Sequence, residues 1–432
     1  MKLILSITFS LFFTSAFSQN SNKIFTSDID NFWVAFDSIQ NTSDYSEKLN
    51  FINKLYINKG TKGLKAFMQE RDYNDTLFVN LIEEYPGFWK SIRPNTLTIK
   101  NKITELNKAV ENLKILYPEL KDAEMYFTIG GLRSGGTVKD NMVLVGAEIA
   151  TGNTNVDMSE FKNDWLKNVF AKQSLDNIVY LNIHEYIHTQ QNGNRTNVLS
   201  QSIAEGSCDF IAELALGKPI QTQYLSYGRA HKNKITKLFK KEMFSSNYSN
   251  WLYNSGQKGE SADLGYYVGY EICKSYYENS KNKSQAIKEI IELNYDDDKA
   301  IEDFLRKSKF FKEKINKNRI VKEYRNNQPY IVKIEPFENG STDVNSDTEE
   351  LRITFSKEME PQSFSINFSK GRKETFPIKK VKGYENNDKT IVFLIDLKPN
   401  KDYEFIITNK SFKSKDGYPL VSDEYLINFK TK

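Results

Sequence analysis

The hydrophobic period of this chain changes near Pro329, and that change limits the possible folds more than any other feature. Upstream, apolar residues recur at steps of three and four, as at Ile99, Ile103 and Leu106, which predicts helices over residues 27–118 and 174–308. Downstream, segments such as 351–355 alternate apolar and polar residues, as strands with one buried face do. The sequence therefore predicts an α+β chain, with a mostly helical domain followed by an all-β one.

The predicted domains span residues 19–328 and 329–432. A chain of 432 residues is too long for one ordinary hydrophobic core, so two domains are expected. Turn signals such as Asn339-Gly340 recur after the boundary at a spacing typical of a β-sandwich. Leu397, Pro399 and Tyr403 match the tyrosine corner of such folds, in which the tyrosine hydroxyl binds nearby backbone.

A small β element interrupts the helical domain. Residues 125–129 and 142–145 are rich in β-forming side chains, and the glycine pairs 130–131 and 135–136 lie between them. This pattern predicts a β-hairpin with a glycine-rich connection. The glycines do not form a phosphate-binding fingerprint, because no G-x-G-x-x-G opens a helix and no Gly-Lys-Ser/Thr follows.

The N-terminus has the features of a cleavable signal peptide over residues 1–18. Lys2 precedes a mostly apolar run, and Ala16 and Ser18 are small residues suited to cleavage before Gln19. No Cys follows this run, which argues against a lipid anchor. No later apolar stretch approaches the roughly 20 residues that a membrane span needs. We therefore expect a periplasmic or secreted protein without a transmembrane segment.

Charge and cysteine content narrow the possible partners. The 60 basic and 56 acidic residues are interspersed and leave a formal charge of +4, so nothing resembles a nucleic-acid-binding surface. Two cysteines, Cys208 and Cys273, could pair in an oxidising compartment. The alternative is that both are small buried hydrophobic residues on helices, and spacing does not decide between these.

Two of the three histidines in the chain fall in the motif His184-Glu185-Tyr186-Ile187-His188. On a helix, His184 and His188 lie one turn apart on one face and can bind the same Zn²⁺. Glu185 then lies beside a water whose pKa the metal lowers, so it can act as general base. The competing interpretation is a polar helix face with two exposed imidazoles.

A third ligand is predicted at Glu205, on the next helical stretch. A short loop with Gly193 and Asn194 separates the two helices, so they can pack against each other. Two histidines and one carboxylate leave a fourth position open for water or substrate, as catalytic zinc requires. Asp209, one turn after Glu205, can accept a hydrogen bond from a ligand histidine and fix its tautomer.

With these residues the chain resembles the gluzincin class of zinc metallopeptidases, which combine H-E-x-x-H with a Glu ligand on the next helix. It also resembles an uncharacterised bacterial family of predicted zinc-dependent proteases, through segments 126–130, 144–148, 184–190, 205–206 and 264–270. The C-terminal part resembles a bacterial Ig-like module through segments 339–344, 353–359 and 415–417. The interval from His188 to Glu205 is slightly shorter than in many gluzincins.

The resemblance to gluzincins implies two further elements. A strand beside the metal pairs with the extended substrate, and the hairpin of residues 125–147 is the candidate for this role, with an ordinary structural hairpin as the alternative. A Tyr or His donates a hydrogen bond to the developing oxyanion, and Tyr266 and Tyr267 are the first candidates. His231 is another, although a solvated histidine at a helix end is the simpler interpretation.

The function that follows is hydrolysis of a peptide or protein substrate by zinc-activated water. The main alternative is an inactive zinc-binding pseudo-peptidase that serves as a binding or assembly protein in the cell envelope. The intact Glu185 favours the enzyme, because a purely structural metal needs no base beside it. A carbohydrate-binding surface protein is less well supported, because the four tryptophans lie outside the predicted sandwich.

Overall fold

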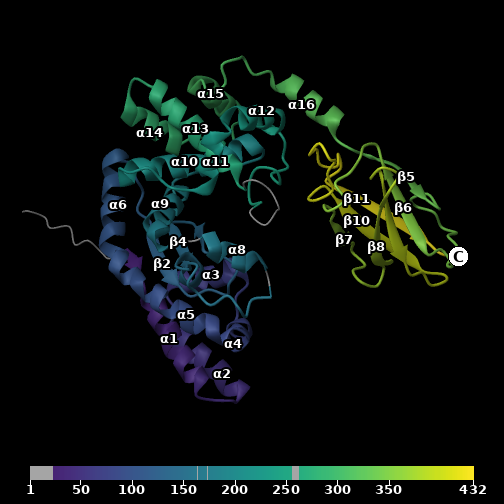
Figure 1. Cartoon of the computed structure of the whole chain (residues 1–432). Coiled ribbons are helices and arrows are strands. Elements are labelled where there is room, and N and C mark those ends of the chain that lie inside the picture. Colours follow the sequence, from purple (N-terminus) through teal and green to yellow (C-terminus); the bar gives the residue numbers. More distant parts are fainter. Residues whose placement is uncertain (1–22, 163, 173, 255–261) are drawn as a thin grey trace, which may run out of the picture. The chain divides into compact units, whose positions relative to one another are not determined.

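The computed structural model describes residues 23–162, 164–172, 174–254 and 262–432 (Figure 1). The predicted signal peptide, residues 1–18, therefore lies outside the described residues. The fold is α+β, as predicted. The described residues divide into two compact units: those within 23–103, 122–162 and 169–175 form the first, and those within 104–121, 164–168 and 176–432 form the second. The second unit includes the helices of the predicted metal site and all of the C-terminal strands.

The first unit is built on an aromatic helical core. Its main helices are α1 (Ser27–Gln40), α2 (Tyr45–Ile52), α3 (Lys62–Arg71), α4 (Asp75–Glu84) and α5 (Pro86–Leu97). Phe32, Trp33 and Trp89 are almost completely buried, and their rings contact one another. The side chains of Thr61 and Asn74 cap α3 and α4. The predicted helical character of residues 27–118 is confirmed here and in α6 (Ile103–Leu116).

The first unit also contains a four-stranded sheet in the order β1-β2-β4-β3. The strands are β1 (Ile24–Phe25), β2 (Glu124–Thr128), β3 (Gly136–Lys139) and β4 (Met142–Gly146), and α7 (Ala147–Ala150) follows them. The prediction of one hairpin over residues 125–147 is wrong in its pairing. β2 and β4 run parallel, and the antiparallel neighbour of β4 is β3, which forms within the glycine-rich connection. Both apolar strands are buried because they are the central pair, whereas β3 is an edge strand.

The helices that lie wholly within the second unit follow residue 176 in the chain. They are α9 (Ile178–His188), α10 (Val198–Leu216), α11 (Gln223–Ala230), α12 (Lys232–Glu242), α13 (Leu264–Asn279), α14 (Lys283–Ile291), α15 (Asp298–Ser308) and α16 (Lys317–Asn327), while α8 (Asp164–Lys172) is shared between the units. Glycines let α10 and α13 approach each other, since a Cβ on Gly206 would lie 2.0 Å from the Tyr270 nitrogen and one on Gly269 1.6 Å from the Ser202 oxygen. Across the described residues, no helix is long and apolar enough to cross a membrane.

The C-terminal strands form an Ig-like domain of two antiparallel sheets. β5 (Ile331–Glu335), β6 (Glu350–Phe355), β9 (Thr390–Ile395) and β8 (Ile378–Glu385) make one sheet, and β11 (Glu424–Lys430), β10 (Asp402–Thr408) and β7 (Ile366–Phe368) make the other. The core is apolar and includes Leu351, Phe393 and Phe405. The predicted tyrosine corner is present, because the Lys398 N–H donates to the Tyr403 hydroxyl over 2.6 Å.

Candidate metal centre

Three ligand-type atoms from two consecutive helices meet inside the second unit. His184 Nε2 and His188 Nε2 are 3.1 Å apart on α9. Glu205 Oε2 on α10 lies 3.1 Å from His188 Nε2 and 3.3 Å from His184 Nε2. The three atoms therefore form a nearly equilateral triangle, and His184 and Glu205 are only 6% and 5% exposed. The spacing predicted from the sequence brings the three side chains together.

This triangle has the size that a tetrahedral zinc ion requires. Ligand atoms at about 2.0–2.1 Å from a tetrahedral zinc lie about 3.3 Å from one another. The observed separations of 3.1–3.3 Å fit three corners of that tetrahedron. Two imidazoles with one carboxylate are also a donor set found in catalytic zinc sites. The residues present therefore fit zinc, with the fourth corner open.

Cys208 also lies close to the histidines but on the other side of the ring. Its Sγ is 3.4 Å from His188 Nδ1, and the three residues His184, His188 and Cys208 can be grouped as potential ligands by distance alone. His188 directs Nε2, not Nδ1, toward His184 and Glu205. One metal cannot bind both nitrogens of the same ring, so Glu205 is the better third ligand. Burial raises the pKa of the Cys208 thiol to about 11, which further disfavours a thiolate ligand.

The local sequence explains why these helices hold ligands rigidly. Ile178, Ile183 and Ile187 are fully buried on α9, so the helix is fixed by packing around its polar residues. α10 begins at a capping box between Asn197 and Ser200 and ends at Gly217 in the left-handed conformation. Both ends of the helix that carries Glu205 are therefore well defined.

The ligand histidines are oriented by side chains behind them. Asp209 Oδ1 lies 2.7 Å from His184 Nδ1, as the sequence predicted, and the same carboxylate accepts from the Tyr180 and Tyr224 hydroxyls at 2.5 and 2.8 Å. Gln191 Oε1 lies 2.9 Å from His188 Nδ1. With Nδ1 bonded to an acceptor, each ring directs Nε2 toward the other ring and Glu205, in the tautomer that a metal ion would require. Sequence analysis missed Gln191, although its place three residues after His188 could have indicated it.

Glu205 is also oriented by two neighbours. Its Oε1 accepts hydrogen bonds from Tyr253 over 2.6 Å and from Gln201 over 3.0 Å, while Oε2 lies toward the two histidines. Gln201 lies one helical turn before Glu205, so its position on α10 gave a signal. Tyr253 lies 48 residues further along the chain, and nothing in the sequence pointed to it.

The electrostatics of the site favour positive charge. Burial alone would lower the pKa of His184, but the Asp209 and Glu205 carboxylates outweigh it and raise that pKa well above its ordinary value. The pKa of His188 is also raised despite burial, through Cys208 and Glu205. Burial would raise the pKa of Glu205, yet the two histidines hold it well below its usual range. The two histidines and Glu205 thus attract positive charge to this site, which a proton or a metal cation would supply.

The predicted catalytic side chains lie at different distances from this triangle. Glu185 is half-buried on α9 next to His184, and no described residue forms a hydrogen bond with its carboxylate. The Tyr266 ring lies beside the His184 ring, with centroids 6.2 Å apart and planes 23° from parallel. Tyr267, by contrast, is fully buried, and its ring packs against Gly228 of α11. Of the two tyrosines, Tyr266 is the one placed beside the histidines.

Three other residues considered from the sequence lie outside the triangle. His231 is exposed at the end of α11, where its ring stacks on Tyr227 with centroids 4.0 Å apart. Cys208 and Cys273 are both free and fully buried, so the structure has them as small buried residues rather than as a disulfide.

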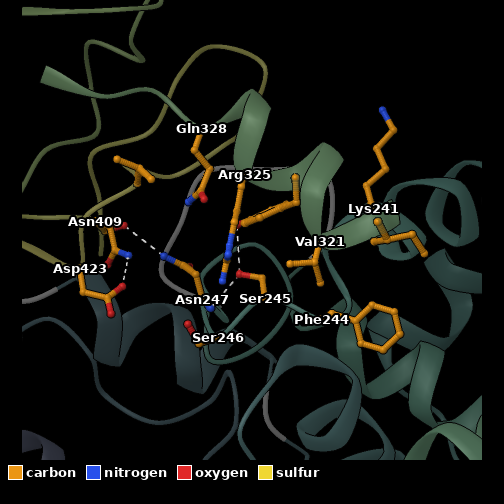
Figure 2. A pocket seen from close by; sticks show the side chains of 13 residues that line it. Lys241, Phe244, Ser245, Ser246, Asn247, Val321, Arg325, Gln328, Asn409 and Asp423 are labelled. Atoms are coloured by element: carbon orange, nitrogen blue, oxygen red, sulfur yellow. Dashed lines mark hydrogen bonds between the residues drawn. The ribbon is translucent and has the colours of Figure 1, made fainter. Parts of the chain in front are cut away.

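Figure 2 shows a separate polar pocket in the second unit. Its lining includes Ser245, Asn247, Arg325 and Asn409, and the Asn247 Nδ2 donates to the Asn409 backbone oxygen over 3.2 Å. None of the residues of the metal triangle contributes to this pocket. The polar pocket is therefore distinct from the candidate metal centre.

Comparison with protein families places both parts of the chain. Residues 16–312 match the model described as gliding motility protein GldB, which covers more than half of the chain. The chain belongs to the GldB family. Residues 325–431 match a bacterial Ig-like domain, which confirms the resemblance of the C-terminal part. Neither family is described as a peptidase family. The GldB match contains the whole metal triangle, and membership of this family is compatible with an envelope or extracellular location.

Comparisons with individual proteins add little. No curated protein matches. CopC from Methylosinus trichosporium OB3b aligns with 24% of this chain and 94% of its own, at 18% identity and a TM-score of 0.19. The S-layer protein rSbsC(31-844) aligns with 60% of this chain and 33% of its own, at 13% identity and a TM-score of 0.19. The N-terminal part of bacterial S-layer protein SbsC aligns with 94% and 77%, at 11% identity and a TM-score of 0.18. TM-scores this low carry no weight for fold or function.

Proposed function

We propose that this GldB-family chain is an exported zinc-dependent metallopeptidase. The observation that supports this most directly is the triangle of His184 Nε2, His188 Nε2 and Glu205 Oε2, whose edges of 3.1–3.3 Å suit a tetrahedral zinc ion. Glu185 supplies the second requirement, a base adjacent to the ligands that is not itself engaged. A structural zinc site normally has four protein ligands, and this donor set has three.

Each residue then has a defined task. Zinc bound here would lower the pKa of a water molecule to about 7 and polarise the carbonyl of the scissile bond. Glu185 accepts the proton of the attacking water and delivers it to the leaving amine nitrogen. Tyr266, on the side of the His184 ring, is the donor available to the carbonyl oxygen as it gains charge. Asp209 and Gln191 keep both imidazoles in the tautomer that presents Nε2.

A second function is favoured by the family and by the Ig-like domain. GldB is described as a gliding motility protein, and a motility role suits a binding or assembly protein of the cell envelope. In that alternative the same triangle holds zinc, the Ig-like domain makes contacts, and no peptide is cleaved. The two functions make different predictions for Glu185, which only the enzyme needs.

The deciding experiment compares three Glu→Gln variants of the zinc-loaded protein on a peptide library. Glu185→Gln should keep one zinc per chain and lose at least about 10²-fold in hydrolysis, the range that general-base catalysis supplies. Glu205→Gln should lose zinc and activity together. Glu278→Gln, an exposed position on α13, is the matched control and should resemble the unmodified protein.

The outcomes separate the alternatives. Equal hydrolysis by Glu185→Gln and the unmodified protein would exclude Glu185 as the base. Stoichiometric zinc without any peptide cleavage would favour the assembly protein. Stoichiometric zinc in both Glu205→Gln and a His188→Ala variant would exclude the ligand set itself.

A further inference from the structure

Another cavity, distinct from the pocket of Figure 2 and from the metal triangle, lies where α15 ends. It has a volume of about 690 Å³ and is formed by the end of α15, the segment 309–315 and Phe244. Four of the residues that line it are apolar, and we refer to them together as its apolar wall: Phe244, Leu305, Phe311 and Ile315. This volume is within the range of about 300–1,000 Å³ typical of pockets for small molecules. None of the proposed zinc ligands lines it.

The acidic residues of this cavity are already neutralised. Glu302 Oε1 lies 2.8 Å from Lys317 Nζ, and Glu313 Oε1 lies 2.7 Å from Lys240 Nζ. Asp303 Oδ1 lies 2.9 Å from Arg306 Nη2. Each of the three carboxylates is therefore paired with a cation, although Glu302 shares Lys317 with Asp298, whose Oδ2 lies 3.0 Å from the same Nζ.

The lysines of the cavity are not neutralised in the same way. Lys309, Lys312 and Lys314 are exposed and line the cavity, and none of the three has an ion-pair partner within the part of the chain that the structure describes. Lys309 is the C-terminal cap of α15, where the chain leaves the helix in the left-handed conformation with φ of 58°. An apolar wall thus borders three cations without counter-charges.

We propose that this cavity binds an anionic amphiphile, with its hydrocarbon chain on the apolar wall and its acidic head group between the three lysines. The apolar wall would bury hydrocarbon, which is favourable in proportion to the area removed from water. The lysines would pair with a carboxylate or phosphate at the exposed edge of the cavity, where each single ion pair contributes modestly and three lysines act together. The alternative is an ordinary cluster of solvated lysines that binds no ligand. Such a cluster would not explain why four apolar side chains line the same cavity.

The binding is tested by calorimetric titration of the full chain with dodecanoate below its micelle concentration. The charge-reversed variant carries Lys309→Glu, Lys312→Glu and Lys314→Glu. The matched control carries Lys370→Glu, Lys373→Glu and Lys380→Glu, which reverse three exposed lysines of the Ig-like domain with the same change in net charge. We expect saturable binding to the unmodified protein and the control, and at least about tenfold weaker binding to the charge-reversed variant.

Three comparisons make the result specific. Replacing the same three lysines by arginine should preserve binding, which shows that loss in the glutamate variant comes from charge and not from misfolding. Phe311→Asp should weaken binding with all lysines present, because it places an acid in the apolar wall. Dodecyltrimethylammonium has the same chain with a cationic head and should not bind measurably.

The proposal would be overturned by any of three results. These are no binding of dodecanoate, equal binding of both amphiphiles, or equal loss in the charge-reversed variant and the matched control. Vesicles containing phosphatidylglycerol, with phosphatidylcholine vesicles as reference, identify the source of the ligand. If the protein binds the phosphatidylglycerol vesicles and not the phosphatidylcholine vesicles, the ligand is a membrane lipid. If it binds dodecanoate but neither kind of vesicle, the ligand is a free acid. Zinc content should be unchanged throughout, so failure here is distinguishable from failure of the peptidase proposal.

Discussion

Helices α9 and α10 and the Ig-like strands bury polar groups in different ways. The helices bury His184, Glu205 and Asp209, which are at most 6% exposed and are all ionisable. Within residues 331–432, all described, the buried polar side chains are hydroxyls such as Thr390 and Thr408, and no Asp, Glu, Lys, Arg or His is buried. One region concentrates charge in its interior, and the other excludes it.

This difference shows where an external ion can contribute to stability. Burying charges costs free energy unless they are well paired. Glu205 helps to raise the pKa of both histidines, and Asp209 helps to raise that of His184, because these carboxylates attract positive charge. The Ig-like core needs no such partner, because apolar burial stabilises it directly. The helices should therefore depend on a cation, and the strands should not.

Removing zinc provides the largest expected effect. At free zinc 1,000 times its dissociation constant, binding stabilises the folded protein by about 4 kcal/mol. A chelator should therefore lower the unfolding temperature of the full chain, whereas the fragment 331–432 should unfold at the same temperature with or without chelator. His188→Ala should behave like the chelated protein. Differential scanning calorimetry measures all three.

The comparison would break in either of two ways. If the fragment 331–432 is unfolded, the Ig-like strands depend on the helices and the predicted boundary at residue 329 is wrong. If chelation leaves the full chain unchanged while zinc is lost, the helices tolerate their buried charges without an ion.

A third buried carboxylate, in the first unit, sharpens the comparison because no ion is involved. Glu148 is fully buried, and its hydrogen-bond donors among the described residues are backbone N–H groups, of Gly130 over 2.8 Å and of Leu132 over 3.3 Å. Burial raises the pKa of Glu148 from 4.5 to about 7. The folded state therefore retains a proton between about pH 4.5 and 7 that the unfolded state releases.

Stability should consequently fall as the pH rises through this window. The unfolded state binds fewer protons there, so the free energy of unfolding decreases, by roughly 3 kcal/mol in total from this group. Above pH 7 its contribution should be constant. Glu148→Gln should remove this part of the pH dependence in urea unfolding, and Glu111→Gln, at an exposed position, should not. A slope that Glu148→Gln leaves intact would assign the pH dependence to other groups.

The next effect concerns the residue that orients a ligand without binding the ion. Asp209→Asn keeps the shape of the side chain but removes the charge that favours the Nδ1–H tautomer of His184. Loss of such a partner typically weakens metal affinity about 10- to 100-fold. Zinc titration against a competing chelator measures the change. Affinity equal to that of the unmodified protein would mean that Tyr180 and Tyr224, not His184, are the important partners of Asp209.

Much of the site could be predicted from the sequence because its residues are local. His184 and His188 share one helical turn, and Glu205 and Asp209 share another, so the 3.6-residue period alone places each pair on one face. Gln201 lies one turn before Glu205 on α10 and follows the same rule, whereas Gln191 lies in the turn after α9, close to His188 only because it is three residues away. Tyr253 approaches Glu205 only through the tertiary fold, which helical periodicity does not encode.

The strand pairing of the first unit failed for a related reason. Two apolar runs joined by a glycine-rich segment are the usual pattern of a hairpin, yet β2 and β4 pair in parallel. The connection itself contains β3, whose four residues are only partly buried and so give little hydrophobic signal. In the Ig-like domain, alternation and turn residues act over short distances, and the predicted class of fold was correct.

The smallest expected effect concerns the tyrosine corner of the Ig-like domain, whose interior contains no charged side chain among the described residues 331–432. Tyr403 is 3% exposed, and its hydroxyl accepts the Lys398 N–H. Tyr403→Phe keeps the ring and its packing but leaves that N–H without its acceptor, so it should cost about 1 kcal/mol. Tyr425→Phe is the matched control, because Tyr425 is half-buried on β11 and its hydroxyl has no hydrogen-bond partner among the described residues. It should change stability by less than about 0.5 kcal/mol.

Both are measured by urea unfolding of the fragment 331–432, with and without chelator. The loss at Tyr403 should be the same in both conditions, and a loss that depends on chelator would mean that the Ig-like domain responds to the ion after all.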